Sequence, residues 1–526
     1  MDTKALRQKI LGLAIRGKLV PQDPNDEPAS VLLERIRAEK QQMVKDGKLK
    51  PKDIKNDTII FVGEDNLHYE KFQNGSVKCI EDEIPFEVPK GWEWCRVRDI
   101  AAVKGGKRLP KGVGFSPCRT AHAYIRVTDM KNHSINTDDL KYISEEVFLQ
   151  IKNYTISKDD LYVTIAGTIG VTGEVPTELD GMNLTENAVK ITNIQINKTY
   201  LCLIIQSEFV QQQFQDKTHQ VAMPKLALER ILSTLIPVCT ITTQSAMVSK
   251  FVEMDSLINQ IREEKEILAE TVSLTKSKIL DLAIRGQLVP QDPNDEPASV
   301  LLERIRAEKE KLIKAGKIKR DKKESIIFRG EDNSYYQQTG TLIENINDWN
   351  LDDIPINWEL CCLGEICDYG NCVNVDTKDI DEEAWVLDLE DIEKDSGKVI
   401  HKIRKYERDS SSTKHLFKKG QVLYSKLRPY LNKVVLADEE GFCTSEILPL
   451  NFSNVVEPQY ALYYLMSPTF LKYANRCSYG VKMPRLGTAD GRKAVFPLPP
   501  FEEQRRISQH ISKIFIEIDN ISNMLL

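Results

Sequence analysis

Two short segments combine basic side chains with glycine or aromatic residues in patterns suited to nucleic-acid contact. KGGKRLPKGVGF begins at Lys104, and its glycines predict a mobile loop that presents several cations to phosphate groups. SKLRPY begins at Ser425 and interleaves Lys and Arg with Tyr430, residue types that contact phosphates, guanine edges and stacked bases. Tyr430 can equally be a core residue. We predict that these and similar side chains contact DNA: Lys104, Lys107, Arg108, Lys111, Arg126, Lys225, Asn371, Lys426, Arg428, Lys482 and Arg485.

Charge is unevenly distributed around these segments. Residues 96–131 contain nine Lys or Arg against two acids, and residues 398–433 contain eleven against two. Residues 376–395 reverse the balance, with ten acids against two basic residues. We therefore expect one positive and one negative face, with ordinary solvated surfaces as the alternative. The net charge of −6 does not exclude a local basic site of this kind.

Motifs for catalysis or metal binding are not recognisable. No phosphate-binding loop of the GxxxxGK[ST] type occurs, and PPF at Pro499 follows Leu498 rather than completing an NPPY-like methyltransferase motif. The eleven cysteines are odd in number and include no CxxC pair, which indicates reduced thiols rather than disulfides or a zinc site. We expect no catalytic residue, metal or cofactor on this chain.

A long internal repeat organises the chain. Residues 10–40 return as residues 279–309 with 29 of 31 positions identical, at an offset of 269. At an offset of 260, AMPKL at Ala222 matches KMPRL at Lys482, and LIPVCTITTQSAM at Leu235 matches VFPLPPFEEQRRI. Together the two offsets nearly equal the length of 526 residues, so the sequence behaves as an almost closed circle of two modules.

Apolar residues spaced alternately four and three apart follow each module and predict long coiled-coil helices. The first ladder covers residues 247–282, a helix of about 50 Å. The second covers the C-terminus and is resumed by Leu6, Ile10 and Leu13. We expect the chain ends to meet and rebuild a second strut, antiparallel to the first, around a pseudo-twofold axis. The predicted spacer residues are Met247, Phe251, Met254, Ile258, Ile261, Leu268, Val272, Ile279, Leu282, Ile507, Ile511, Ile514, Ile518 and Ile521.

The predicted fold class is α+β, with two mixed α/β domains, called the heads, separated by long antiparallel coiled-coil helices. The predicted boundaries are an N-terminal helical segment at 1–50, a linker at 51–91, the first head at 92–240, a central helical region at 241–318, a second linker at 319–357, the second head at 358–500 and a C-terminal helix at 501–526.

Each copy of the repeat also predicts a shorter helix. DPNDEPASVLLERIRAEK offers capping acids before Pro28 or Pro297, and Gly47 or Gly316 closes the helix. The basic tails that follow, KLKPKDIK and KIKRDKK, are expected to be solvated segments, with nucleic-acid or partner contact as the alternative.

Composition indicates a globular protein of the cell interior. Apolar residues make up 41% and charged residues 29%, and no apolar run approaches the ~20 residues that cross a bilayer. The N-terminus lacks the continuous apolar core of a signal peptide, so we expect a cytoplasmic protein.

Over essentially its whole length the sequence resembles the DNA specificity subunits of type I restriction-modification systems. The resemblance rests on LAIRGKLVPQDPNDEPAS, on PLPPFEEQRRI before a long helix, on GTIG and KLRPYLNK within the heads, and on the order head, strut, head, strut. It implies a non-catalytic subunit whose two target recognition domains each read half of a bipartite, asymmetric DNA site. LIPVCTITTQSAM departs from the pattern because it lacks the PLPP–EQ signature after the first head.

The resemblance also implies partners. Two methyltransferase subunits would dock on the struts, which would set the distance between the half-sites. Restriction-translocase subunits would join them, and S-adenosylmethionine, ATP and magnesium would belong to these partners. Two other classes stay open: a coiled-coil scaffold whose heads bind proteins, and a free methyltransferase or nuclease. Salt-sensitive, sequence-selective DNA binding separates the first from our interpretation, and activity of the purified chain with cofactor separates the second.

Overall fold

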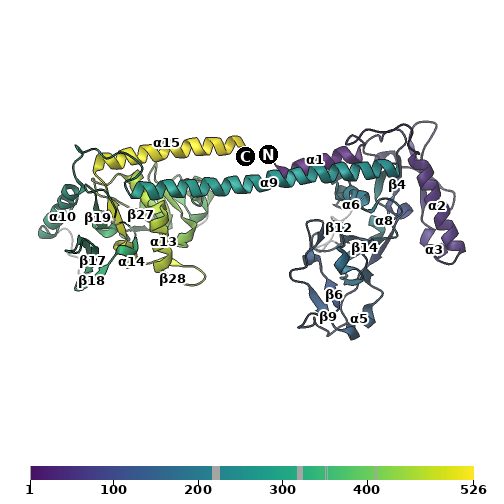
Figure 1. Cartoon of the computed structure of the whole chain (residues 1–526), viewed down its shortest axis with the longest axis horizontal. Coiled ribbons are helices and arrows are strands. Elements are labelled where there is room, and N and C mark those ends of the chain that lie inside the picture. The colour runs from purple at the N-terminus through teal and green to yellow at the C-terminus, as the bar shows by residue number, and fades with distance from the viewer. Residues whose placement is uncertain are drawn as a thin grey trace. The chain divides into compact units, whose positions relative to one another are not determined.

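The computed structural model describes residues 2–215, 225–316, 324–349, 351, 353–408 and 412–525. The chain forms two compact units, Met1–Glu263 and Glu264–Leu526, and the division falls inside the long helix α9 (Ile241–Ile284). Each unit combines short, mostly antiparallel sheets with helices (Figure 1), so the predicted α+β class is confirmed. In the part of the chain that is described, no helix is long and apolar enough to span a membrane.

The first unit begins with helices α1 (Thr3–Ile15), α2 (Ala29–Lys45) and α3 (Pro51–Ile54). Pro28 stands immediately before α2, and Gly47 follows the helix with a φ of +72°, the left-handed conformation that suits glycine after a helix. No side chain caps the N-terminus of α2, because Asp26 instead accepts hydrogen bonds from the Thr240 and Thr243 hydroxyls. The shared repeat segment is thereby tied to the start of α9.

An ordered sheet occupies each segment that we expected to be a linker. In the first unit it contains β1 (Thr58–Val62), β2 (His68–Phe72) and β3 (Val77–Cys79), and in the second unit β16 (Ser325–Arg329), β17 (Tyr335–Thr339) and β18 (Leu342–Asn345). Both sheets turn at the sequence GEDN, where Asn66 and Asn333 adopt positive φ values of 60° and 64°. The basic tail KIKRDKK, residues 317–323, lies outside the described residues.

The first head is built from two four-stranded sheets and a two-stranded base. The base pairs β4 (Glu93–Arg96) with β15 (Leu235–Val238). One sheet has the order β12 (Thr172–Glu174), β11 (Leu161–Thr164), β14 (Ala188–Thr192), β5 (Ala102–Gly105), and the other β10 (Thr155–Ile156), β13 (Met182–Leu184), β6 (His122–Ile125), β9 (Lys141–Ile143). A short hairpin joins β7 (Met130–Lys131) to β8 (Ser134–Ile135), and the helices are α4 (Val97–Ile100), α5 (Glu145–Ile151), α6 (Lys198–Gln206), α7 (Glu208–Gln215) and α8 (Leu228–Leu232).

The second unit follows the same plan, but its two sheets have three and five strands instead of four each. Its base pairs β19 (Glu359–Cys362) with β30 (Val495–Leu498). One sheet has the strand order β25 (Val434–Leu436), β24 (Val422–Ser425), β27 (Ile447–Leu450). The other has the order β20 (Val373–Val375), β23 (Lys414–Phe417), β26 (Gly441–Thr444), β21 (Trp385–Leu387), β22 (Ile403–Arg404). A hairpin pairs β28 (Ser478–Tyr479) with β29 (Arg485–Leu486). The helices are α10 (Ala298–Lys314), α11 (Leu363–Ile366), α12 (Pro458–Met466), α13 (Pro468–Cys477), α14 (Thr488–Lys493) and α15 (Phe501–Leu525).

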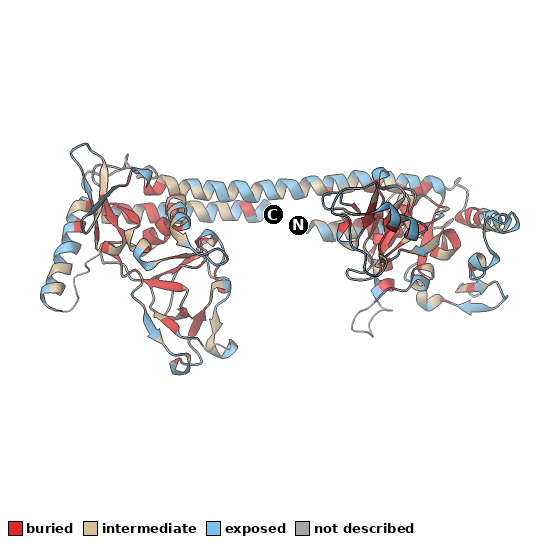
Figure 2. Ribbon diagram, turned by 90° about the horizontal axis from the view of Figure 1, so that it is seen from below, coloured by how far each residue is buried: buried red, intermediate tan, exposed pale blue. Residues whose placement is uncertain are grey.

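Buried apolar residues concentrate in the strands and inner helices of each head (Figure 2). Strand β11 is buried at all four positions, as are β24 and β27, which fits strands covered on both faces. Nearly every residue of α6 and α12 is buried, because each helix lies between a sheet and a long helix. Burial of this apolar surface is the main source of stability in each head.

The duplication extends to individual hydrogen bonds. Tyr200 Oη donates to the carbonyl of Pro237 at 3.1 Å, and Tyr460 Oη donates to that of Pro497 at 2.9 Å. The Gln244 and Gln504 amides donate to the carbonyls of residues 239 and 499 at 2.8 and 2.9 Å. The first segment departs from the PLPP–EQ signature but therefore still keeps its glutamine, Gln244, which fixes the start of α9 as Gln504 fixes the start of α15.

Helix α1 lies alongside the first part of α9 and runs in the opposite direction (Figure 1). Arg7 pairs with Asp255 at 2.8 Å and stacks over the Phe251 ring. The predicted spacer side chains Met247, Phe251 and Ile258 are buried, and Met254 and Ile261 are half-buried.

In the second unit, α15 runs antiparallel to the last part of α9. Lys276 pairs with Asp519, whereas Gln291, beyond the end of α9, donates to Glu503 at 2.7 Å. The predicted spacer residues Ile507 and Ile511 are fully buried, but Ile521 is 57% exposed and Ser522 takes the buried position. The others are half-buried: Leu268, Val272, Ile279, Leu282, Ile514 and Ile518.

Candidate nucleic-acid interface

The glycine-rich segment of the first head lies at the edge of a sheet. Lys104 is exposed on β5, the edge strand that pairs with β14. A Cβ atom at Gly106 would lie 2.1 Å from the Thr185 carbonyl oxygen and 2.4 Å from that of Leu184. Only glycine therefore allows the chain to approach the β13–β14 turn this closely, and Lys107 N then donates to the Leu184 carbonyl at 2.9 Å.

Glu186, in that turn, is the centre of the basic cluster of the first head. Arg108 Nε donates to its carboxylate at 2.6 Å, and Lys225 Nζ donates to its main-chain carbonyl at 3.1 Å. Burial raises the pKa of Glu186, but the hydrogen bonds from Arg108 and neighbouring groups outweigh burial, so this pKa lies below its ordinary value. The carboxylate is therefore charged at neutral pH and orients the Arg108 guanidinium.

The basic residues of the first head divide into available and committed groups. Lys104 and Lys111 are exposed and form no ion pair with any described residue, and Lys107 lies over the Tyr154 ring at 5.4 Å. Arg126, by contrast, pairs with Asp129 at 2.6 Å and with Asp139.

Arg96, which opens the basic run of the first head, is buried and structural. Its guanidinium pairs with Glu70 and Glu83, both at 2.8 Å. Breaking a buried pair of this kind by removing one partner typically costs 3–5 kcal/mol. Part of the high local count of basic residues therefore serves folding.

In the second head the corresponding acid is Glu446, at an offset of 260 from Glu186. Arg485, at the same offset from Lys225, donates from Nε and Nη2 to the Glu446 carboxylate at 2.9–3.2 Å. Lys426 N donates to the Glu446 carbonyl at 3.0 Å. The acid therefore holds together the β24 loop and the β28–β29 hairpin, and Arg485 is committed to this contact.

Several predicted contact residues surround this junction in the second head. Asn371 is exposed in the turn before β20, and Lys482 is exposed at the tip of the β28–β29 hairpin. The Tyr430 and Tyr479 side chains are 48% and 64% exposed, so the structure resolves the alternative for Tyr430 in favour of a surface position. The exposed surface thus combines cations with aromatic side chains, as stacking on bases requires.

The expected separation of the second head into a positive and a negative face is wrong. The acidic and basic runs pair with each other: Arg408 contacts Asp391 at 2.5 Å, and Lys414 contacts Asp388 at 3.0 Å. Lys405 also pairs with Glu382. Because these runs come from neighbouring strands and loops, their charges neutralise one another.

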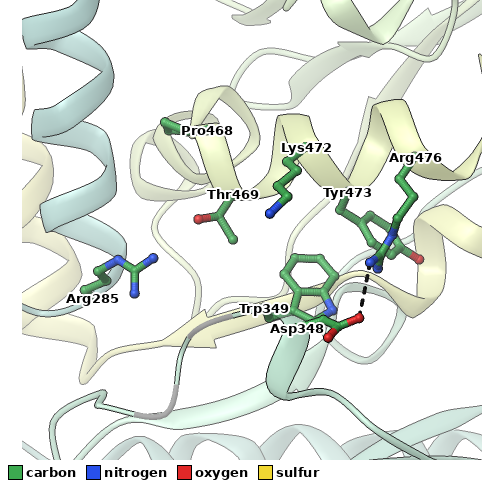
Figure 3. A pocket seen from close by; sticks show the side chains of 8 residues that line it. All are labelled: Arg285, Asp348, Trp349, Pro468, Thr469, Lys472, Tyr473 and Arg476. Atoms are coloured by element: carbon green, nitrogen blue, oxygen red, sulfur yellow. Dashed lines mark ion pairs between the residues drawn. The ribbon is translucent and has the colours of Figure 1, made fainter.

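Sequence patterns missed a small basic pocket in the second unit (Figure 3), with a volume of about 160 Å³. Trp349 packs against Tyr473 at 4.6 Å between ring centroids, and Arg476 pairs with Asp348 at 3.5 Å. Lys472 and Arg285 also line the pocket. In the first unit Phe209, at an offset of 260 from Thr469, packs in an aromatic group with Phe86 and Trp94. The second unit therefore has the smaller Thr469 where the first unit has Phe209, and the pocket lies beside this threonine.

Comparisons with known proteins fit this duplicated arrangement. The family described as the type I restriction modification DNA specificity domain matches residues 89–270 and 355–525, more than half of the chain. The EcoAI specificity subunit of Escherichia coli is 26% identical over 588 residues, covering 97% of this chain and 88% of its own. The EcoEI specificity subunit, also from Escherichia coli, is 29% identical over 414 residues, covering 69% of this chain but only 61% of its own.

One solved structure has a comparable fold. It is described as the structural basis of complex assembly and conformational transition of the type I R-M system, and the matched chain has a TM-score of 0.51. The match covers 84% of this chain and 94% of the other, at 15% identity, which supports the fold alone. On the evidence of the family match, the chain belongs to the DNA specificity subunits of type I restriction-modification systems.

Proposed function

We propose that each head of this non-catalytic specificity subunit reads one half of a bipartite DNA site. The observation that carries the proposal is the pair of acid-centred junctions at Glu186 and Glu446, which share a frame but carry different exposed side chains. A shared frame with different contact residues is what two recognition domains for different half-sites require.

Phosphate contacts are assigned to the cations that form no ion pair within the described part of the chain. In the first head these are Lys104 and Lys111, and in the second head Lys426 and Lys482. Arg126 and Arg485 instead position their loops, because their guanidinium groups already bind carboxylates. Neutralising several phosphates makes binding strongly salt-dependent, which distinguishes this function from a scaffold whose heads bind proteins.

Helix α9 is proposed as the spacer between the half-sites. It contains 44 residues without interruption, which corresponds to about 66 Å at 1.5 Å per residue. Helices α1 and α15 pack along its two parts within their own units, as an antiparallel strut requires. We further propose that these two helices together form the second strut around a pseudo-twofold axis, which would explain the nearly circular repeat.

The outer face of α9 is proposed to dock the methyltransferase subunits. Val252, Leu257, Ile267 and Leu274 are 53–64% exposed, although they lie on a helix whose opposite face is covered. Uncovered apolar side chains along a helix are typical of protein interfaces. S-adenosylmethionine, ATP and magnesium would be bound by the methyltransferase and restriction subunits, so this chain would contribute recognition only.

A matched pair of glycine substitutions tests the DNA surface of the first head. Gly106→Ala is expected to weaken binding of the reconstituted methyltransferase complex to its cognate duplex by about tenfold or more. The added Cβ must push the basic segment away from the Thr185 carbonyl, and overpacking of this kind costs about 1–3 kcal/mol. Gly105→Ala is the control, because no atom lies within 4 Å of the added Cβ.

Titration of a fluorescent duplex with each folded complex measures the effect. Equal affinity of the Gly106→Ala complex and the wild type would show that this segment does not contact DNA. A circular dichroism melt of both variants separates local displacement from unfolding.

A further inference from the structure

Arg428 has a backbone conformation that its residue type rarely adopts. Its φ and ψ are 50° and 62°, in the left-handed helical region. For an L-residue with a Cβ atom this conformation costs roughly 1–2 kcal/mol. Such residues persist where the surroundings enforce them, and they cluster at functional sites.

The loop around Arg428 is fixed at both ends. Arg428 N donates to the Pro484 carbonyl at 2.7 Å, and Leu427 forms a β-bridge with Arg485. At the other end Asn432 is also left-handed, with a φ of 47°, and its amide donates to the Met466 carbonyl at 3.2 Å. These contacts therefore hold the main chain at Arg428 in one conformation.

The first head uses glycine at the same place. Strands β11 and β24 correspond at an offset of 261, and the next left-handed residues are Gly167, with a φ of 79°, and Arg428. The two loops also make equivalent main-chain hydrogen bonds. Leu226 N donates to the Ile165 carbonyl at 2.9 Å in the first head, and Leu486 N donates to the Lys426 carbonyl at 3.0 Å in the second. Since glycine satisfies the loop without strain, the fold alone does not require an arginine here.

Among the residues that the structure describes, the Arg428 side chain has no partner. Its Nε is buried, and within the described residues no group accepts a hydrogen bond from it or forms an ion pair with the guanidinium. The neighbouring Arg485, in contrast, is held by Glu446. A buried donor left unpaired costs roughly 1–3 kcal/mol, so the free state carries both strain and an unsatisfied group.

We infer that Arg428 reads a guanine in the half-site of the second head, by donating from its guanidinium to O6 and N7. This inference rests on the proposed function and names one base contact within it. A rigid loop and a planar fork suit bidentate contact with a base edge, whereas a phosphate contact requires no fixed orientation. The first head has no side chain at this position, so its half-site is read by other residues.

Single-molecule sequencing of DNA methylation in the host tests the inference with chromosomal variants of the full system. Arg428→Asn removes the fork but tolerates the left-handed backbone, and Arg428→Lys keeps the charge. Both are expected to make one fixed G·C position of the second half-site degenerate, with discrimination reduced at least tenfold, while the first half-site stays unchanged. Lys419→Asn, an exposed change elsewhere in the second head, is the control and should leave both halves intact.

An unchanged motif in the Arg428→Asn strain would overturn the inference. So would a uniform fall in methylation at an unchanged motif, or its restoration by Arg428→Lys, because either result indicates a phosphate contact. Arg428→Gly copies the first head and checks the fold: loss of all methylation in the Asn, Lys and Gly strains would assign Arg428 a structural role. If deletion of the wild-type gene removes no motif, the proposed function itself fails, which is a separate result.

Discussion

Exchanging the first head, residues 92–240, for that of another specificity subunit is expected to replace one half of the recognised sequence completely. The other half should be unchanged, because each unit has its own buried core, around Tyr200 in the first unit and Tyr460 in the second. Sequencing of the methylated motifs in cells that carry the hybrid gene measures both halves together. A change in both halves, or in neither, would contradict independent reading by the heads.

The junctions decide whether such a hybrid folds. Strands β4 and β15 pair from Glu93 with Val238, so cuts before Trp92 and after Thr240 keep the base of the head intact. Trp92 Nε1 donates to Gln22 at 2.7 Å, and Thr240 donates to Asp26 at 2.8 Å. A hybrid should retain Trp92 and Thr240, and the native head reinserted through the same cuts is the matched control.

Inserting one heptad into α9 between Ile261 and Leu268 is expected to lengthen the preferred gap and leave both half-sites unchanged. Seven residues add about 10 Å to a helix, or up to about three base pairs at 3.4 Å each. They turn the helix by nearly two whole turns, so the covered face is preserved. The methylated motif of the insertion strain measures the gap.

An insertion of two residues at the same place is the contrasting variant. It rotates the second part of the helix by more than half a turn relative to the first, so it should abolish or strongly reduce methylation. A heptad variant that methylates the original motif with its original gap would contradict the spacer role of α9.

The sequence predicted the elements whose signals are local or repeated. Heptad spacing predicted α9 and α15. Gly47 and Gly316 correctly marked the ends of α2 and α10. The small sheets near Gly63 and Gly330 were missed, because basic tails and few apolar residues made these segments resemble linkers. Their signal was present in the GEDN turn that both copies share.

The site was harder to predict because charge in the sequence does not show which side chains pair. Arg96, Arg126 and Arg485 count as basic residues, yet each pairs with an acid in the folded chain. Some of these acids are distant in the sequence: Glu446 lies 39 residues from Arg485. The common offset of 260 between Glu186 and Glu446 could have suggested that the two acids have equivalent roles. It could not have predicted which side chains they contact.

The most direct measurement for the central claim is genome-wide DNA methylation in the host, by single-molecule sequencing, with this gene intact and deleted. The account predicts that one split motif, two fixed halves around an unread gap, is methylated when the gene is intact and unmethylated when it is deleted. If every methylated motif persists in the deletion strain while the partner methyltransferase is expressed, the chain does not specify the DNA target and the account is wrong.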